Sequence, residues 1–296
     1  MTEQQRSVQK MKVLLAGAYG KLGTDVLKTL VREGHDVLAV DMVTRDIDGI
    51  EGKYEKKKVD VTKPEQVKGI CAGREVVITT VGLTGSSATV TNYDVDYQGN
   101  LNILNDAVKE GVKNFAYVSV LKADDPKAAG VSMLDAKAKF EKKLKESGLQ
   151  YTIYRPTGYF YDIVKVFKPM IAKGKVTLLG KEPVSCNVID TTDLADFMVK
   201  HMLDDNKTYN IGGTETYTYE EIANMMFAVN GKTPNISRAP VWLFDVLAWI
   251  QKVKKTGKES IIRFSKWTLS NSMVADTEYG KLSFKKYIEE NGKVDA

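Results

Sequence analysis

The stretch KVLLAGAYGKLG, residues Lys12–Gly23, decides the fold. An apolar run at residues 13–16 leads into three glycines, Gly17, Gly20 and Gly23, and a helical pattern of apolar residues follows at once. This order predicts a strand, a tight turn and a helix. Glycines let the backbone approach a ligand closely, and the N-terminus of a helix offers unpaired N–H groups at its positive dipole end. The stretch therefore predicts a site for the pyrophosphate of a dinucleotide.

An acidic residue follows at the distance that a dinucleotide site needs. A second apolar run, Asp36–Val40, ends in Asp41, 18 residues after Gly23. A carboxylate there can accept hydrogen bonds from the adenosine ribose, and its charge repels a 2′-phosphate, which favours NAD. Two cations, Lys21 in the turn and Arg45 after the strand, can reach such a phosphate, so NADP stays open.

Composition limits the classes of protein to consider. The 296 residues are 43% hydrophobic and 27% charged, which is ordinary for a globular protein. A net charge of +5 is mild for this length and predicts no nucleic-acid partner. Two cysteines and two histidines exclude a disulfide framework and lead us to expect no metal. The polar residues 1–10 and the lack of a long apolar run predict a cytoplasmic protein without a membrane span.

Strand-like and helix-like runs alternate through the first half of the chain. Several of the strand-like runs are continuously apolar, as expected for strands that are buried on both faces of a parallel sheet. Repeated strand–helix units predict an α/β fold with a doubly wound parallel sheet of the Rossmann type. The predicted strands are Lys12–Ala16, Asp36–Val40, Lys57–Val59, Val76–Thr80, Asn114–Ser119 and Gln150–Tyr154, and the predicted helices are Gly23–Arg32, Pro64–Ala72, Tyr97–Glu110 and Leu134–Ser147.

The second half is richer in helical patterns. We predict a dinucleotide-binding Rossmann domain at 11–160 and a smaller, mostly helical substrate lobe at 161–296, with 186–205 able to return to the main sheet. Ligands of open α/β sheets bind at the carboxyl ends of the strands, where this lobe is expected. Its predicted elements are the strands Lys175–Leu179, Cys186–Asp190 and Tyr209–Ile211, and the helices Asp193–Leu203, Tyr219–Val229, Val241–Lys254 and Tyr279–Glu290.

From about Lys12 to about Gly213 the chain resembles the extended or atypical short-chain dehydrogenase/reductase superfamily, with a looser similarity to its divinyl-reductase-like and isoflavone-reductase-like members. The resemblance implies a nicotinamide cofactor held by the glycine turn, by an acid-plus-apolar pair at the adenine, by backbone beside the ribose, and by the ends of the fifth and sixth strands. The implied cofactor-binding residues are Gly17, Tyr19, Gly20, Lys21, Leu22, Gly23, Asp41, Asp60, Val61, Thr80, Val81, Gly82, Ser119, Lys137, Pro156 and Thr157.

The chain departs from the superfamily at its usual catalytic pair, Tyr-x-x-x-Lys. In that pair the lysine and the cationic nicotinamide lower the tyrosine pKa, so that the phenol can pass a proton. Lys137 falls on the lysine position, which puts Met133 in place of the tyrosine. A thioether cannot move a proton. The usual serine also looks replaced, since Val120 and Leu121 follow Ser119.

Three interpretations of this departure remain open. Lys137 acts alone, or with Ser119, and holds the ribose hydroxyls; its other interpretation is an exposed lysine among several on one helix. Alternatively Tyr159 or Tyr161, just after the sixth strand, supplies a phenol, although aromatic packing between the lobes is the favoured interpretation of both residues. In the third interpretation no chemistry occurs, and the protein binds the cofactor as a regulator or assembly factor.

The sequence thus predicts an NAD(P)-dependent oxidoreductase or epimerase-like enzyme for a small organic substrate, as a monomer or homodimer, with a cofactor-binding regulator as the alternative. One segment stays outside this scheme. The aromatic run at Val241–Ile250 is expected to pack on the core, or else to form a lid or a dimer face.

Overall fold

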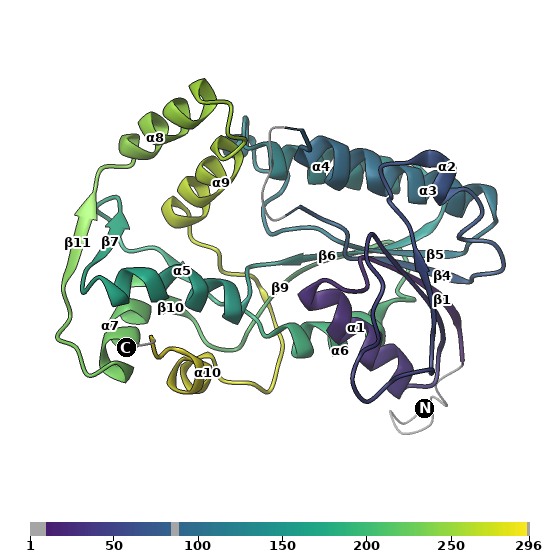
Figure 1. Cartoon of the computed structure of the whole chain (residues 1–296), viewed down its shortest axis with the longest axis horizontal. Coiled ribbons are helices and arrows are strands. Elements are labelled where there is room, and N and C mark those ends of the chain that lie inside the picture. Colours follow the sequence, from purple (N-terminus) through teal and green to yellow (C-terminus); the bar gives the residue numbers. More distant parts are fainter. Residues whose placement is uncertain (1–9, 84–88, 295–296) are drawn as a thin grey trace.

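A single eight-stranded sheet forms the centre of the molecule (Figure 1). The structure is a computed structural model and describes residues 10–83 and 89–294. Each pairing in this sheet is parallel. The expected doubly wound α/β fold is thereby confirmed. In spatial order the strands are β12 (Thr277–Glu278), β9 (Lys207–Gly212), β6 (Gln150–Pro156), β5 (Asn114–Val118), β4 (Val76–Thr79), β1 (Lys12–Ala16), β2 (Asp36–Asp41) and β3 (Glu55–Lys58).

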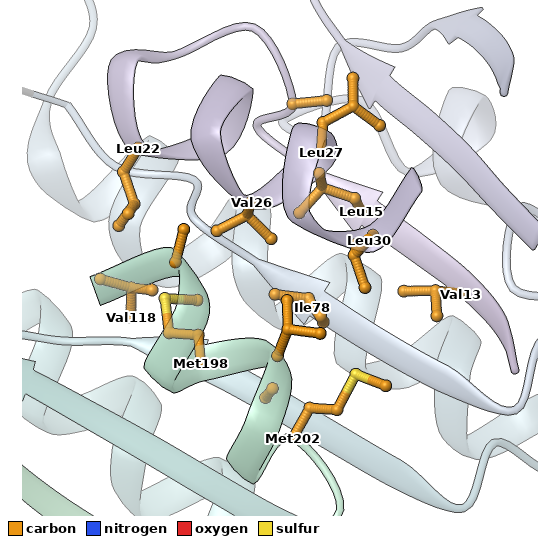
Figure 2. Close-up of a cluster of buried hydrophobic side chains, with 14 of the residues drawn as sticks. Val13, Leu15, Leu22, Val26, Leu27, Leu30, Ile78, Val118, Met198 and Met202 are labelled. Atoms are coloured by element: carbon orange, nitrogen blue, oxygen red, sulfur yellow. The ribbon is translucent and has the colours of Figure 1, made fainter. Parts of the chain in front are cut away.

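Helices cover both faces of the sheet (Figure 1). One face carries α2 (Pro64–Val67), α3 (Asn100–Lys109) and α4 (Ser132–Lys145), and the other carries α1 (Lys21–Arg32) and α6 (Thr191–His201). Figure 2 shows how side chains of α1 and α6 meet those of β1, β4 and β5 in one buried cluster. Full burial of a Val or Leu side chain contributes roughly 1.5–3 kcal/mol, so this cluster fixes α1 firmly at the end of β1.

The chain returns to the main sheet after residue 160. Helix α6 packs against α1, and β9 then pairs with β6 along five residues. Much later, β12 pairs with β9 and completes the sheet. The segment 186–205, which the sequence allowed to rejoin the sheet, therefore contributes a helix to its α1 face.

A second hydrophobic core lies beside the sheet and holds most of the remaining elements together, with residues 242–253 outside it. Strand β11 pairs with β7 in parallel, and β10 pairs with β8 in antiparallel fashion. The elements outside the main sheet and its covering helices are α5 (Phe160–Ala172), β7 (Val176–Leu179), β8 (Ser185–Cys186), β10 (Tyr217–Thr218), α7 (Tyr219–Val229), β11 (Ile236–Ala239), α8 (Trp242–Val253), α9 (Glu259–Ser270) and α10 (Phe284–Asn291). Two further helical segments, η2 (Tyr93–Gly99) and η3 (Pro126–Ala128), precede α3 and α4.

Some predicted elements were wrong in extent. The helix expected at Pro64–Ala72 ends at Val67, and Gly69 takes a positive φ of 78° that cannot continue it. The strand expected at Cys186–Asp190 is shorter, since β8 covers only Ser185–Cys186 and Ile189 forms an isolated bridge with Tyr159. Asp190 already caps α6 by accepting the Thr192 N–H. The sequence did not predict α5 or α9 at all.

In residues 10–83 and 89–294, no helix has both the length and the apolar character that crossing a bilayer requires.

His35 makes the stability of this fold sensitive to mild acid. The side chain is buried between α1 and β2, with 5% of its surface exposed, and its Nδ1 accepts the Met11 N–H at 3.2 Å. Burial lowers the pKa of His35 below its ordinary 6.5. The unfolded chain therefore binds more protons than the folded chain below about pH 6.5, so stability is full above that pH and falls as the pH drops.

We expect the urea midpoint to fall between about pH 7.5 and pH 5.5, and the fall to be smaller in His35→Gln, whose amide can still accept the Met11 N–H. His201→Gln is the control, since the His201 side chain is partly exposed beside Asp204. An equal fall in His35→Gln and in the wild type would contradict this origin of the pH dependence.

Candidate functional site

The turn between β1 and α1 has no room for side chains at two of its glycines. Gly17 has a φ of +77°, and a Cβ there would lie 2.7 Å from Thr80 Oγ1. A Cβ on Gly23 would lie 2.0 Å from the Gly17 carbonyl oxygen. Thr80 Oγ1 donates to that same oxygen at 3.0 Å, which ties the turn to the end of β4. The turn is thus held tightly between two strands and a helix.

The third glycine leaves the start of α1 open. Gly20 is the N-cap residue, has no side chain to cap the helix, and would place a Cβ no closer than 3.5 Å to any described atom. The first N–H groups of a helix lack partners within the helix, and here they belong to Lys21, Leu22 and Gly23. A helix N-terminus that has no side-chain cap and is preceded by a glycine is suited to bind a pyrophosphate.

Asp41 and Arg45 lie at the mouth of this turn. The Asp41 carboxylate accepts the N–H groups of Tyr19 at 3.0 Å and Met42 at 2.7 Å. The Arg45 guanidinium donates to the Tyr19 carbonyl at 2.9 Å and lies 5.8 Å from the centre of its ring. The two charges are therefore committed to the local backbone, one on each side of Tyr19.

Asp60 and Val61 follow β3 and also have structural partners. Asp60 Oδ1 accepts the N–H and the hydroxyl of Thr62, so the carboxylate closes a turn. Val61 is buried against Gly99, where a Cβ would lie 2.8 Å from its Cγ2, and its carbonyl accepts from Asn102 Nδ2. Only part of the Asp60 side chain is left for a ligand.

Lys137 sits in a buried ion pair. Its Nζ lies 3.2 Å from Asp96 Oδ1 and donates to the Val118 carbonyl at 3.3 Å. Asp96 is fully buried and Lys137 is 9% exposed, so Lys137 is no surface lysine. A Cβ on Gly82 would lie 3.0 Å from Asp96 Oδ1 and 3.3 Å from Lys137 Nζ. The pair therefore lies against the bare backbone that follows β4.

Two buried hydroxyls at the end of β5 have no hydrogen-bond partner in the described part of the chain. One is Ser119 Oγ, just after β5, and the other is Tyr117 Oη on β5 itself. The Lys137 ammonium lies 5.4 Å from the centre of the Tyr117 ring. Burial raises the Tyr117 pKa well above its ordinary value, with the Asp96 and Glu141 carboxylates adding to the effect. Tyr117 thus remains a neutral phenol under the ammonium.

A chain of hydrogen bonds connects the ion pair to α9. Asp96 Oδ2 accepts from Asn92 Nδ2 at 3.1 Å. Asn92 Oδ1 in turn accepts the hydroxyls of Ser260 on α9 at 2.7 Å and of Ser132 on α4 at 3.3 Å. The position of Lys137 is therefore linked, through three side chains, to a helix far along the chain.

The residues after β6 are divided between packing and the edge of the site. Pro156 accepts the Leu121 N–H through its carbonyl, and Thr157 Oγ1 donates to the Asn187 carbonyl, so both are part of the sheet framework. Tyr159 caps α5, stacks on Tyr161 at 5.7 Å between ring centres, and has a pKa that burial raises well above its usual range.

The residues that the resemblance named thus fall into two sets. Gly82 and Lys137 meet at the ion pair with Asp96, where Lys137 also donates to the Val118 carbonyl, and the glycine turn meets Thr80 at the end of β4. Pro156 and Thr157 are held by backbone contacts elsewhere along the sheet edge. The sequence analysis missed Asp96; the available signal was an acidic residue between Val95 and Tyr97 at the start of a predicted helix. In the described residues no group of three His, Cys, Asp or Glu side chains could hold a metal ion.

Known proteins share part of their sequence and their fold with this chain. The profile of the NAD(P)H-binding family matches residues 17–205. The photosystem II assembly factor Ycf39 of Cyanophora paradoxa is 25% identical over 245 residues, which are 80% of this chain and 74% of that protein. The chloroplastic divinyl chlorophyllide a 8-vinyl-reductase of Arabidopsis thaliana is 26% identical over 321 residues, which are 95% of this chain and 74% of that protein.

Solved structures share the fold at lower identity. The NADPH-dependent quinone oxidoreductase of Escherichia coli, complexed with NADPH, aligns with a TM-score of 0.68 at 17% identity and covers 94% of this chain and 99% of its own. A nucleoside-diphosphate-sugar epimerase of Staphylococcus aureus aligns with a TM-score of 0.73 at 16% identity and covers 95% and 96%. The chain therefore belongs to the NAD(P)H-binding family, with the fold of the extended and atypical short-chain dehydrogenase/reductases that its sequence resembles.

Proposed function

We propose that this protein is an NAD(P)-dependent oxidoreductase in which Lys137, held by Asp96, takes the place of the usual tyrosine–lysine pair. The observation that carries the proposal is the buried ion pair itself. Burying a charged pair costs several kcal/mol of desolvation for each ion, so this pair is kept at a cost to stability. Lys137 is fixed beside Gly82, whose backbone carries no side chain. This lysine is therefore suited to hold a polar ligand next to Gly82.

The chain offers the cofactor three sets of groups. We assign the pyrophosphate to the N–H groups at the start of α1, the adenosine ribose to Asp41, and the nicotinamide ribose to Lys137 and the backbone at 80–82. Bound NAD(P)H supplies the hydride. Lys137 orients the ribose and donates a hydrogen bond toward the acceptor, while Met133, buried at the position of the missing tyrosine, contributes only apolar surface.

The substrate we propose is a small organic molecule that accepts hydride, held between the sheet edge and the lobe at 161–296. Relatives at 26–29% identity are named divinyl chlorophyllide a 8-vinyl-reductases, which makes divinyl chlorophyllide a a specific acceptor to test. Ser119 and Tyr159 are the hydroxyls we assign to the proton side of the reaction. Burial raises the pKa of Tyr159, which keeps its phenol protonated.

For the coenzyme we propose NAD over NADP. A carboxylate at Asp41 would repel a 2′-phosphate on the ribose that we assign to it. Arg45, the nearest cation after β2, is already engaged by the Tyr19 carbonyl and ring. Both observations favour a free 2′-hydroxyl.

A second candidate is a cofactor-binding assembly factor without turnover. The observation that favours it is Met133, which leaves Lys137 without a neighbouring phenol of the usual kind. Relatives at 23–26% identity named photosystem II assembly factors support the same alternative. Turnover distinguishes the two candidates, because both of them bind the coenzyme.

Replacing Lys137 tests the reaction. With NADH or NADPH and divinyl chlorophyllide a or a quinone as acceptor, we expect Lys137→Met to lower the rate of hydride transfer about 100-fold or more. Coenzyme binding, followed by fluorescence, should stay measurable. Lys142→Met, on the exposed side of the same helix, is the matched control. Tight coenzyme binding with no oxidation by any acceptor in the wild type would favour the assembly factor instead.

Two glycine variants distinguish an effect on folding from an effect on phosphate binding. Gly23→Ala forces a Cβ onto the Gly17 carbonyl, so we expect the free energy of unfolding to drop by about 2 kcal/mol or more. Gly20→Ala has room for its methyl group in the free protein and should unfold like the wild type, yet bind NADH more weakly because the methyl group meets the pyrophosphate. If calorimetry shows equal NADH affinity for Gly20→Ala and the wild type, the pyrophosphate does not bind at this turn.

A pair of variants tests the coenzyme preference. Asp41→Ala should weaken NADH binding and relax the discrimination against NADPH, because the repelling charge is removed. Arg45→Ala is the comparison and should leave the ratio of NADH to NADPH affinity close to that of the wild type. An unchanged ratio in Asp41→Ala would show that Asp41 does not select the coenzyme.

A further inference from the structure

Helix α8 presents an apolar stripe to the outside. Trp242, Val246, Trp249 and Val253 follow one another at intervals of three or four residues and therefore lie on one side of the helix. Their exposed fractions are 59%, 42%, 63% and 62%. Single exposed apolar residues are ordinary, but two exposed tryptophans in one stripe are a mark of an interaction surface.

No other part of residues 10–83 and 89–294 covers this stripe. Helix α8 lies at the outer edge, where it packs against α9, and Ala248 is its only fully buried residue (Figure 1). The expectation that this helix packs its apolar residues on the core is therefore wrong for most of them. The stripe contributes little to folding.

Positive charge is concentrated beside the stripe. Residues 242–270, which form α8 and α9, contain six basic and two acidic side chains, whereas the whole chain has a net charge of only +5. Lys252, Lys254, Lys255 and Lys258 are all exposed at the end of α8. Asp245, one of the two acids, is paired with Lys266 at 2.7 Å. An anionic surface would therefore meet lysines with little opposing charge.

We propose that the α8 stripe, Trp242, Val246, Trp249 and Val253, docks on the surface of a lipid bilayer that contains anionic headgroups. Tryptophan prefers the boundary between headgroups and acyl chains, and interfacial helices combine such residues with flanking lysines. Protein–protein interfaces, in contrast, are depleted in lysine, which argues against a second copy of this chain as the occupant. The helix lies on the bilayer and does not cross it.

Vesicle binding tests this proposal on the full chain. We expect sedimentation with vesicles of equal parts phosphatidylcholine and phosphatidylglycerol, little with phosphatidylcholine alone, and weaker binding as salt is raised. Tryptophan emission should shift to the blue with the anionic vesicles. The double variant Trp242→Ala/Trp249→Ala retains only Trp267, which is 5% exposed, and should lose both the shift and at least about tenfold in binding.

Charge reversal provides the second arm. Lys254→Glu/Lys255→Glu should lower binding to the anionic vesicles on the order of tenfold or more, whereas Lys142→Glu/Lys143→Glu on α4 should leave it unchanged. Val108→Ala/Leu203→Ala, which removes exposed apolar residues elsewhere, is the control for the tryptophans. Thermal unfolding of each variant checks the fold. Equal vesicle binding by the tryptophan variant and the wild type would overturn the proposal. It would also be overturned if neither protein bound vesicles and the wild type formed a dimer in solution that the tryptophan substitutions dissociated.

Discussion

The close approach of α1 to the end of β1 is the constraint on which the rest of the structure depends. The Gly17 carbonyl lies so near Gly23 that a methyl group on Gly23 would come within 2.0 Å of it. Backbone that bends this sharply brings the start of the helix directly over the carboxyl end of the sheet. The buried cluster between α1, α6 and the sheet then keeps it there. Position and charge at the proposed phosphate site would thus come from the main chain, while side chains preserve the geometry.

The Asp96–Lys137 pair adds a second fixed point on the same sheet edge. Each ion would be costly to bury alone, and the pair persists because backbone and side-chain donors complete its contacts. Lys137 is therefore held in one place by a carboxylate, a carbonyl and an aromatic ring. Whether the protein turns over a substrate or only senses a coenzyme, the same ammonium defines where a polar ligand group can be recognised.

The sequence predicted those parts of the fold whose signals are local. The first strand ends where expected, at Ala16, because an apolar run meets a glycine that only a turn can use. Helix α5 escaped prediction since Pro169 lies inside it, and proline normally argues against a helix interior. Asp96 escaped because an acid near a helix start usually faces water. Here the helix begins as the wider π-helical turn η2, and Asp96 is buried. The roles assigned to individual site residues stay predictions.

The late return of the chain to the main sheet has a consequence for how this protein can be divided. Strand β9 pairs with β6, and β12 pairs with β9, although both come after the lobe has begun. A fragment that ended near residue 160 would leave β6 as an unpaired edge strand and would leave α1 without its neighbour α6. The two halves share one sheet, so unfolding should be cooperative across them. Neither half is a separate module that could be replaced without disrupting the sheet.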